Sequence, residues 1–163
     1  ANDLAKHYKA NNVLEYGRFY SEIKSYSGIE WESEDFEHIA NIQNQIESRL
    51  HAKSSKVLIC DTNSFATEIW HERYMGYMSK LVRRISDSIS APDLYILTGD
   101  EIPFVQDGTR DGEGIRHQMH QRFLEELESR GHNYILVTGS KEKRFSVSVK
   151  VIDSIIESHS KIV

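Results

Sequence analysis

Three short stretches of the chain are apolar at consecutive positions and are bounded by charged or turn-forming residues. They cover residues 56–61, 93–98 and 133–138. Each is too short for a typical helix, and consecutive apolar residues are typical of strands that are buried on both faces of a parallel sheet. A fourth, weaker strand is expected at residues 13–16. The pattern therefore predicts a parallel sheet built from these strands.

Between the predicted strands, apolar residues recur at spacings of three and four, which is the period of an amphipathic helix. The first of these helices is expected to begin with Ser33 as its cap and with Glu34 and Asp35 in its first turn. Because strands and helices alternate, the sequence predicts an α/β fold with three layers (α/β/α), in which helices cover both faces of the sheet. The apolar positions of the four helices are Phe36, Ile39, Ile42, Ile46 and Leu50; Met75, Met78, Leu81, Val82, Ile85 and Ile89; Met119, Phe123, Leu124 and Leu127; and Phe145, Val149, Ile152 and Ile156.

Composition favours one globular domain spanning residues 1–163. The chain is 39% hydrophobic, and it has only two prolines and no repeat that would mark a linker. The formal net charge of −5 argues against a dedicated nucleic-acid binder. No apolar run approaches the roughly 18 residues of a membrane helix, so no membrane partner is expected. The single cysteine, Cys60, cannot form an internal disulfide, which favours a cytoplasmic protein and a core role for this thiol.

Polar residues follow the predicted strands, at the edge where parallel α/β sheets bind their ligands. An Asp after an apolar strand is typical of a Walker B position, where the carboxylate holds Mg²⁺ through water or accepts a proton from a substrate hydroxyl. A turn or a cap for the next helix is the alternative for such an Asp. In chain order, the polar residues after the four strands are Glu15 and Arg18; Asp61, Thr62 and Asn63; Thr98, Gly99 and Asp100; and Thr138, Gly139 and Ser140.

Residues 103–116 are rich in glycine and charge, and they lie between a predicted strand and a predicted helix. They contain Arg110 and Arg116, and arginines on a closing loop can stabilise the charge that develops on a transferred phosphoryl group. A solvated surface loop is the alternative. Arg144, after the last strand, is a candidate to flank an adenine, and a simple strand-to-helix turn is the alternative there.

Two histidines make a metal site conceivable on the third predicted helix. His117 and His120 are three residues apart, with Asp111 and Glu113 nearby. A chance pair is the favoured interpretation, because the chain has eight histidines and no second ligand pair with matching spacing.

Four segments stand in a characteristic order and spacing. They are Leu14-Glu-Tyr-Gly-Arg18, Val57-Leu-Ile-Cys-Asp-Thr-Asn63, Pro103-Phe-Val-Gln-Asp-Gly-Thr-Arg110 and the turn at residues 139–144. Together they resemble the ribosylnicotinamide kinase domain of the NadR proteins, a family of P-loop kinases, over nearly the whole chain. The resemblance implies a P-loop NTPase fold, with ATP and Mg²⁺ as cofactors. It also implies transfer of the γ-phosphoryl group to the 5′-hydroxyl of nicotinamide riboside, which makes nicotinamide mononucleotide for NAD synthesis.

The resemblance also implies roles for the matching residues. Asp61 takes the Walker B-like position near Mg²⁺ and the substrate hydroxyl, and Glu15 and Arg110 act with it in catalysis. A nucleoside-binding group and a group that binds ATP complete the site. The nucleoside-binding residues are Glu15, Tyr16, Arg18 and Asn63, and the ATP-binding residues are Asp107, Arg110, Arg116 and Arg144, with residues 103–116 as the lid.

Three features depart from the family pattern. The sequence contains no G-x-x-x-x-G-K-[ST] motif, so residues 1–11 are expected to be the remainder of the P-loop helix in an N-terminally truncated domain that binds ATP poorly. Leu14 stands where the family often has an aromatic residue, which puts the stacking of a nicotinamide ring in doubt. Asn63 stands where the family has an acidic residue, which removes one carboxylate near the metal.

These departures leave two other functions open. One is a nucleotide-binding regulatory or trafficking module, and the other is a general P-loop NTPase without a small-molecule acceptor. The partners expected from the resemblance are a nucleoside and ATP, and an upstream adenylyltransferase domain is a further expectation for the parent protein.

Overall fold

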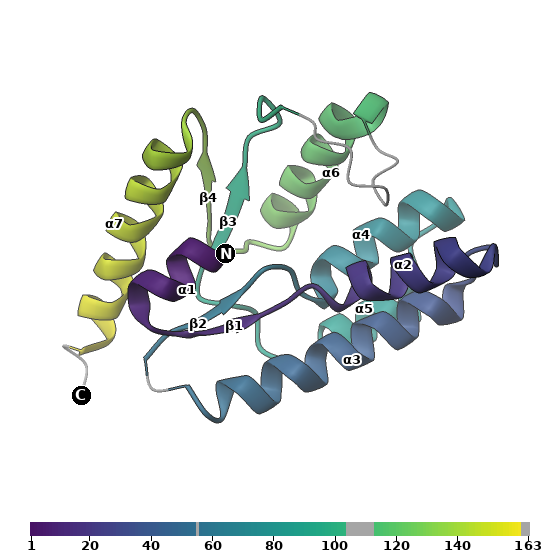
Figure 1. Ribbon diagram of the computed structural model, residues 1–163, viewed down its shortest axis with the longest axis horizontal. Helices are drawn as coiled ribbons and strands as arrows, with labels where there is room; N and C mark the ends of the chain where they lie inside the picture. The colour runs from purple at the N-terminus through teal and green to yellow at the C-terminus, as the bar shows by residue number, and fades with distance from the viewer. Residues whose placement is uncertain (55, 104–112, 161–163) are drawn as a thin grey trace. The chain divides into compact units, whose positions relative to one another are not determined.

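The computed structural model describes residues 1–54, 56–103 and 113–160 of the chain (Figure 1). The chain forms two compact units, Ala1–Ser90 and Ala91–Val163, and each has its own pair of parallel strands.

The first unit is mostly helical. Its strands β1 and β2 pair in parallel with Val13 opposite Cys60, and α2 and α3 connect them. The backbone N–H of Asp61 donates to the carbonyl of Val13 at 2.8 Å, which continues the pairing one residue beyond β2. The elements are α1 Asn2–Tyr8, β1 Asn11–Val13, α2 Tyr16–Ser27, α3 Ser33–His51, β2 Leu58–Cys60, α4 Ser64–Met75 and α5 Lys80–Ser86.

The sequence placed the first strand two residues too late. The strand expected at residues 13–16 ends at Val13, and Tyr16 is already the first residue of α2. The helix expected near the N-terminus is confirmed as α1, which ends at Tyr8 and is followed by Lys9 in the left-handed conformation. Whether α1 is the remainder of a P-loop helix stays a prediction.

Helix α3 is the central element of the first unit, and it contacts α2, α4, α5 and both strands (Figure 1). The predicted inward positions Phe36 and Ile39 are buried. The helix is capped one residue earlier than expected, because Glu32 occupies the N-cap and its backbone N–H donates to the Asp35 carboxylate at 2.7 Å. The core cluster lies between α3 and α5 and consists of Phe36, Ala40 and Val82, with Trp31, Trp70, Met75 and Ile85 packed against it.

The single helix expected through residues 75–89 is wrong. Helix α4 ends at Met75, where Gly76 adopts a φ of 79° and its N–H donates to the carbonyl of Glu72. Glycine adopts this left-handed conformation without steric cost, which is why the helix ends here. The next helix, α5, begins anew because the hydroxyl of Ser79 accepts hydrogen bonds from the backbone N–H groups of Leu81 and Val82.

The second unit consists of β3 Tyr95–Thr98, the 3-10 turn η1 Glu113–Ile115, α6 Arg116–Ser129, β4 Tyr134–Val137 and α7 Lys141–Ser160. Strands β3 and β4 pair in parallel with Thr98 opposite Val137, and α7 packs against β4. Both predicted strands and both predicted helices of this region are confirmed. However, Leu136 in β4 is 45% exposed, so the expectation of strands buried on both faces is wrong at this position.

The described residues thus form a mixed helix-and-strand structure with two small parallel sheets. The three-layer arrangement and the single domain over residues 1–163 stay predictions. No helix in the described part of the chain is long and apolar enough to cross a membrane.

Candidate functional site

Two of the predicted groups of site residues lie at one edge of the first unit. Because β1 and β2 are parallel and end at the paired residues Val13 and Cys60, the segments that follow them leave the sheet at the same edge. We call residues 14–16 the β1 loop and residues 61–63 the β2 loop. The β1 loop carries Glu15 and Tyr16, and the β2 loop carries Asp61 and Asn63.

The charged side chains of this edge are partly open to solvent. Arg18 lies in the first turn of α2, and its Nε is 3.7 Å from a carboxylate oxygen of Glu15. Both side chains are about one third exposed, and Asp61 is exposed. Asn63 is the N-cap residue of α4. The edge therefore presents two carboxylates and a guanidinium within one unit.

Tyr16 contacts α3. Its hydroxyl lies 3.0 Å from Nε2 of His38, and the two rings lie 5.8 Å apart. Its backbone N–H, in contrast, donates to the side chain of Gln43 at 2.9 Å.

Gln43 is a residue of this edge that the sequence analysis missed. It lies on α3 and is only 1% exposed. Its amide nitrogen donates to the carbonyl oxygens of Leu14 at 3.3 Å and Thr62 at 3.1 Å, and its amide oxygen accepts from the N–H of Tyr16. One buried side chain therefore binds both loops. The signal was present in the sequence, because Gln43 is a polar residue four positions after the inward-facing Ile39.

The β2 loop fits the way in which proteins bind Mg²⁺. This ion is usually held by one or two carboxylates, with water and substrate phosphates as its other ligands. Asp61 supplies an exposed carboxylate at the end of a strand, and Glu15 supplies a second one at the same edge. Among the described residues, no group of three or more His, Cys, Asp or Glu side chains converges on one point, so an all-protein metal cage is not formed there.

Cys60 is the last residue of β2 and carries a thiol next to this edge. Burial raises the pKa of Cys60 to about 12, and the neighbouring Glu47 carboxyl adds to this effect. Burial also raises the pKa of Glu47. A thiol with so high a pKa stays protonated at neutral pH, and this agrees with the expectation that Cys60 is a packing residue.

The second unit has its own cluster of polar groups at the ends of β3 and β4. Nδ1 of His117 lies 2.7 Å from a carboxylate oxygen of Asp100, and this contact holds the pKa of Asp100 below its usual value. The Glu101 carboxylate accepts the backbone N–H of Gly139 at 2.7 Å, which lowers the pKa of Glu101. These contacts tie the segments after the two strands to each other and to α6.

The two predicted ATP-binding arginines in the described part of the second unit bind backbone carbonyls. Arg116 donates to the carbonyls of Asp100, at 3.0 Å, and of Ile102. Arg144 donates to the carbonyl of Gly139. Both side chains therefore help to hold the segments at the strand ends.

Two predicted ATP-binding residues lie outside the described part of the chain, and the metal site considered at His117 and His120 can be compared with the structure. Asp107 and Arg110, with most of the predicted lid, lie outside the described residues. His117 pairs with Asp100, and it is not part of a group of three potential metal ligands in the described ranges, nor is His120.

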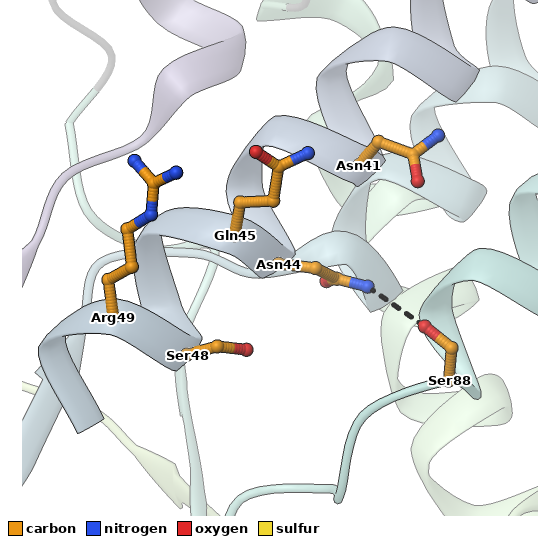
Figure 2. Close-up of a pocket in the computed structure, with 6 residues that line it drawn as sticks. All are labelled: Asn41, Asn44, Gln45, Ser48, Arg49 and Ser88. Carbon is orange, nitrogen blue, oxygen red and sulfur yellow. Dashed lines mark hydrogen bonds between the residues drawn. The ribbon is translucent and has the colours of Figure 1, made fainter. Parts of the chain in front are cut away.

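A separate hollow of about 350 Å³ lies between α3 and the end of α5 (Figure 2). Within it, the amide nitrogen of Asn44 lies 3.5 Å from the hydroxyl of Ser88. Its lining contains none of the predicted site residues and consists of Asn41, Asn44, Gln45, Ser48, Arg49 and Ser88.

The sequence was compared with protein-family models and with curated proteins. A family model described as an AAA domain matches residues 1–144. No curated protein matches the chain at a significant level. The match includes both strand pairs and both groups of polar residues at the strand ends. The chain therefore belongs to the AAA domain family, which places it among the P-loop NTPase-type domains that bind nucleotides.

Proposed function

We propose that this protein transfers the γ-phosphoryl group of ATP to the 5′-hydroxyl of nicotinamide riboside. The observation that carries the proposal is that Glu15 with Arg18, and Asp61, follow the paired ends of two parallel strands in an AAA domain. A nucleotide-binding domain supplies the phosphoryl donor, and a pair of carboxylates beside a guanidinium suits a polyhydroxylated acceptor.

The chemistry assigned to these residues is positioning and proton transfer. The acceptor oxygen attacks the γ-phosphorus, the bond to the β–γ bridging oxygen breaks, and ADP leaves with that electron pair. The hydroxyl proton passes to a carboxylate, with Asp61 as the first candidate and Glu15 as the second. Mg²⁺, when bound beside Asp61, neutralises charge on the phosphates. Arg18 and Glu15 orient the ribose, so that the attacking oxygen approaches in line.

A nucleotide-dependent switch without a nucleoside acceptor is the second candidate. Leu14 favours it, because this side chain is 49% exposed at the edge where a stacking aromatic ring would serve a nicotinamide substrate. A switch of this kind binds nucleotide and hydrolyses it slowly, at a rate that no nucleoside changes.

The test uses the protein at its full natural length, incubated with MgATP and nicotinamide riboside and followed by ³¹P NMR. A new phosphomonoester signal that requires both substrates supports the kinase. ATP binding and slow hydrolysis without that signal contradicts it and favours the switch.

Asp61→Asn sharpens the same test. It should lower kcat by about 10²-fold or more, because a catalytic acid or base typically contributes 10²- to 10⁴-fold. Asp87→Asn, which changes an exposed carboxylate at the end of α5, should leave kcat within about twofold. Equal turnover of the Asp61→Asn variant and the natural protein would remove Asp61 from the mechanism.

A further inference from the structure

We infer that Gln43 is a positioning residue that joins the β1 loop and the β2 loop into one rigid edge, so that the acceptor and the Asp61 carboxylate are held in register. The effect of this role on kcat rests on the proposed function, whereas its effect on the hydrogen exchange of the loop backbone does not.

The amide of Gln43 makes three hydrogen bonds. A glutamine side chain offers one carbonyl oxygen and two N–H groups. The oxygen accepts from the backbone of Tyr16, and the nitrogen donates to Leu14 in one loop and to Thr62 in the other. The reversed amide would set N–H against N–H and carbonyl against two carbonyls. The network therefore allows a single orientation of this side chain.

The backbone groups that Gln43 binds have no substitute partners in regular structure. The N–H of Tyr16 is the first of α2, and the first four N–H groups of a helix have no acceptor inside it. Leu14 and Thr62 lie beyond the last paired residues of their strands. Because the Gln43 side chain itself is only 1% exposed, its amide depends on these backbone groups for its hydrogen bonds, and losing them is costly. Neither loop can shift without breaking a hydrogen bond of the same amide.

Three replacements of similar size do not make the same three hydrogen bonds. Glutamate retains the acceptor for Tyr16 but has no donor for the two carbonyls. Methionine has a similar length and removes all three hydrogen bonds. Asparagine is one methylene shorter and cannot span both loops from the same backbone position. The neutral amide also makes this connection insensitive to pH.

In the proposed reaction, the hydrogen bonds of Gln43 to the two loops affect kcat. Phosphoryl transfer depends on the placement of the attacking oxygen relative to its carboxylate, and an error of about 1 Å can cost about 10²-fold in rate. The β1 loop is assigned to the acceptor and the β2 loop to the carboxylate. A looser connection between them should therefore reduce kcat more than it weakens acceptor binding.

The structural test compares Gln43→Met with Gln45→Met in the full-length protein. Gln45 lies on the same helix and is exposed, so it is a matched control. Amide hydrogen exchange should become at least about tenfold faster at Tyr16 in Gln43→Met and stay unchanged in Gln45→Met. Gln43→Glu should keep the protection of Tyr16, because its carboxylate still accepts that N–H. Unchanged exchange at Tyr16 in Gln43→Met would overturn the inference.

A comparison within the natural protein covers the case in which the Gln43 variants do not fold. After correction for intrinsic rates, the Tyr16 amide should exchange at least about tenfold more slowly than the amide of Lys80. Lys80 is likewise the first residue of its helix, and its side chain is exposed. Equal rates at the two amides would overturn the inference.

The kinetic test uses the same variants with MgATP and nicotinamide riboside. Gln43→Met and Gln43→Glu should lower kcat by about 10- to 100-fold and change the acceptor KM by less than about threefold. Adding Asp61→Asn to Gln43→Met should lower kcat less than the product of the two single effects, since both changes disturb one unit. Multiplicative effects, or a loss confined to KM, would contradict the positioning role. If the natural protein transfers no phosphoryl group, the proposed function fails and the exchange experiment still decides the role of Gln43.

Discussion

The ends of β1 and β2 and the ends of β3 and β4 have the same parallel geometry but are held in opposite ways. In the first unit, a buried neutral amide, that of Gln43, binds the loops. In the second unit, the corresponding segments are held by carboxylates near the surface, that of Asp100 beside His117 and that of Glu101 on the backbone of Gly139. Buried hydrogen bonds are strengthened by the low local dielectric, whereas exposed ionic contacts are weakened by water and salt.

The same contrast is found between one carboxylate of each unit and the side chain that contacts it. Lys24 and Asp35 lie 2.7 Å apart in the first unit, and each side chain is only 10% exposed. His117 in the second unit pairs with Asp100 at the same distance but is 78% exposed. Distance alone therefore says little about what a pair contributes, and burial decides it.

Asp35 is the centre of the buried network. Burial by itself would raise the pKa of this carboxyl, but hydrogen bonds from Lys24, Tyr20 and the backbone of Glu32 outweigh it, and the pKa is lowered. The hydrogen bond to Asp35 in turn raises the pKa of Tyr20 to about 12. The carboxylate is thus held ionised by three partners.

The chain offers a simple way to follow the first unit separately. It contains two tryptophans, Trp31 and Trp70, and both lie in the first unit. Tryptophan fluorescence therefore reports the unfolding of that unit, and hydrogen exchange of peptides from α6 and β4 reports on the second unit.

The largest effect is expected at the buried pair. Lys24→Met should lower the free energy of unfolding of the first unit by about 3 kcal/mol, because it leaves the Asp35 carboxylate buried without its cation. Urea unfolding followed by tryptophan fluorescence measures this change. Lys53→Met, at an exposed lysine after α3, should stay within about 0.5 kcal/mol. A loss below about 1 kcal/mol for Lys24→Met would mean that burial does not distinguish the two pairs.

The next effect is a pH dependence of the free energy of unfolding of the first unit. His71 is fully buried, and burial lowers its pKa below the ordinary 6.5, so the unfolded chain binds more protons as the pH falls. Stability from His71 is therefore present above about pH 6.5 and is lost as the pH falls toward the folded-state pKa. Glu47 acts in the opposite direction, because its raised pKa favours the folded state as the pH falls toward 4.5.

Glu47→Gln separates these two contributions. In this variant, the free energy of unfolding of the first unit, measured with urea, should fall between pH 7.5 and pH 5, by no more than about 1.4 kcal/mol per pH unit for one proton. Asp100 and Glu101 have lowered pKa values, so their contribution to the second unit is lost only below about pH 4.5. A free energy of unfolding of the first unit that rises over this range would contradict a buried neutral His71.

A smaller effect is expected at two helix caps. Ser79 is buried, and its hydroxyl accepts from two backbone N–H groups of α5 in the first unit. Ser140 is exposed, and its hydroxyl accepts from the backbone N–H of Lys143 in the second unit. Ser79→Ala should cost about 1 kcal/mol by urea unfolding, and Ser79→Asp should retain most of this stability, since aspartate is also a good cap. Ser140→Ala should speed up hydrogen exchange at the start of α7 less than Ser79→Ala does at the start of α5. A larger effect of Ser140→Ala would contradict the idea that the buried cap contributes more than the exposed one.

The smallest effect is expected at the exposed pair. His117→Ala should leave the hydrogen-exchange protection of α6 and β4 unchanged at neutral pH, because solvent screens its contact with Asp100. Raising the salt concentration should change neither the natural protein nor the variant in that region. A marked loss of protection would show that this surface contact holds the second unit as firmly as a buried one.

Much of the local structure was predictable because its signals lie within a few residues. The apolar runs identified β2, β3 and β4, and the three-to-four spacing identified α3, α6 and α7. The spacing failed through residues 75–89, where apolar residues continue in helical period across Gly76. A left-handed glycine ends the helix whatever the period of its neighbours, and Ser79 then starts a new one.

The candidate site was predictable only in outline. Glu15 and Asp61 were predicted as site residues because polar residues after buried strands have a known place in parallel sheets, and the structure shows that they follow paired strands. Gln43 was not recognised, since it lies in the middle of α3, where a polar residue is usually a solvent-facing one. Its spacing from Ile39 indicates an inward position, but the two loops that its amide binds come from distant parts of the sequence.

The sequence by itself determined where β2, β3, β4 and most of the helices form, since hydrophobic period and turn residues act over a few positions. It also determined which chemical groups follow the strands. Only the tertiary structure decided which buried polar groups find partners: Gln43 with two strand-end loops, Lys24 with Asp35, and His71 with Ser33 and Tyr77. The reason is physical. A buried polar group is stable only when a complementary group arrives from another part of the chain, and that encounter depends on packing.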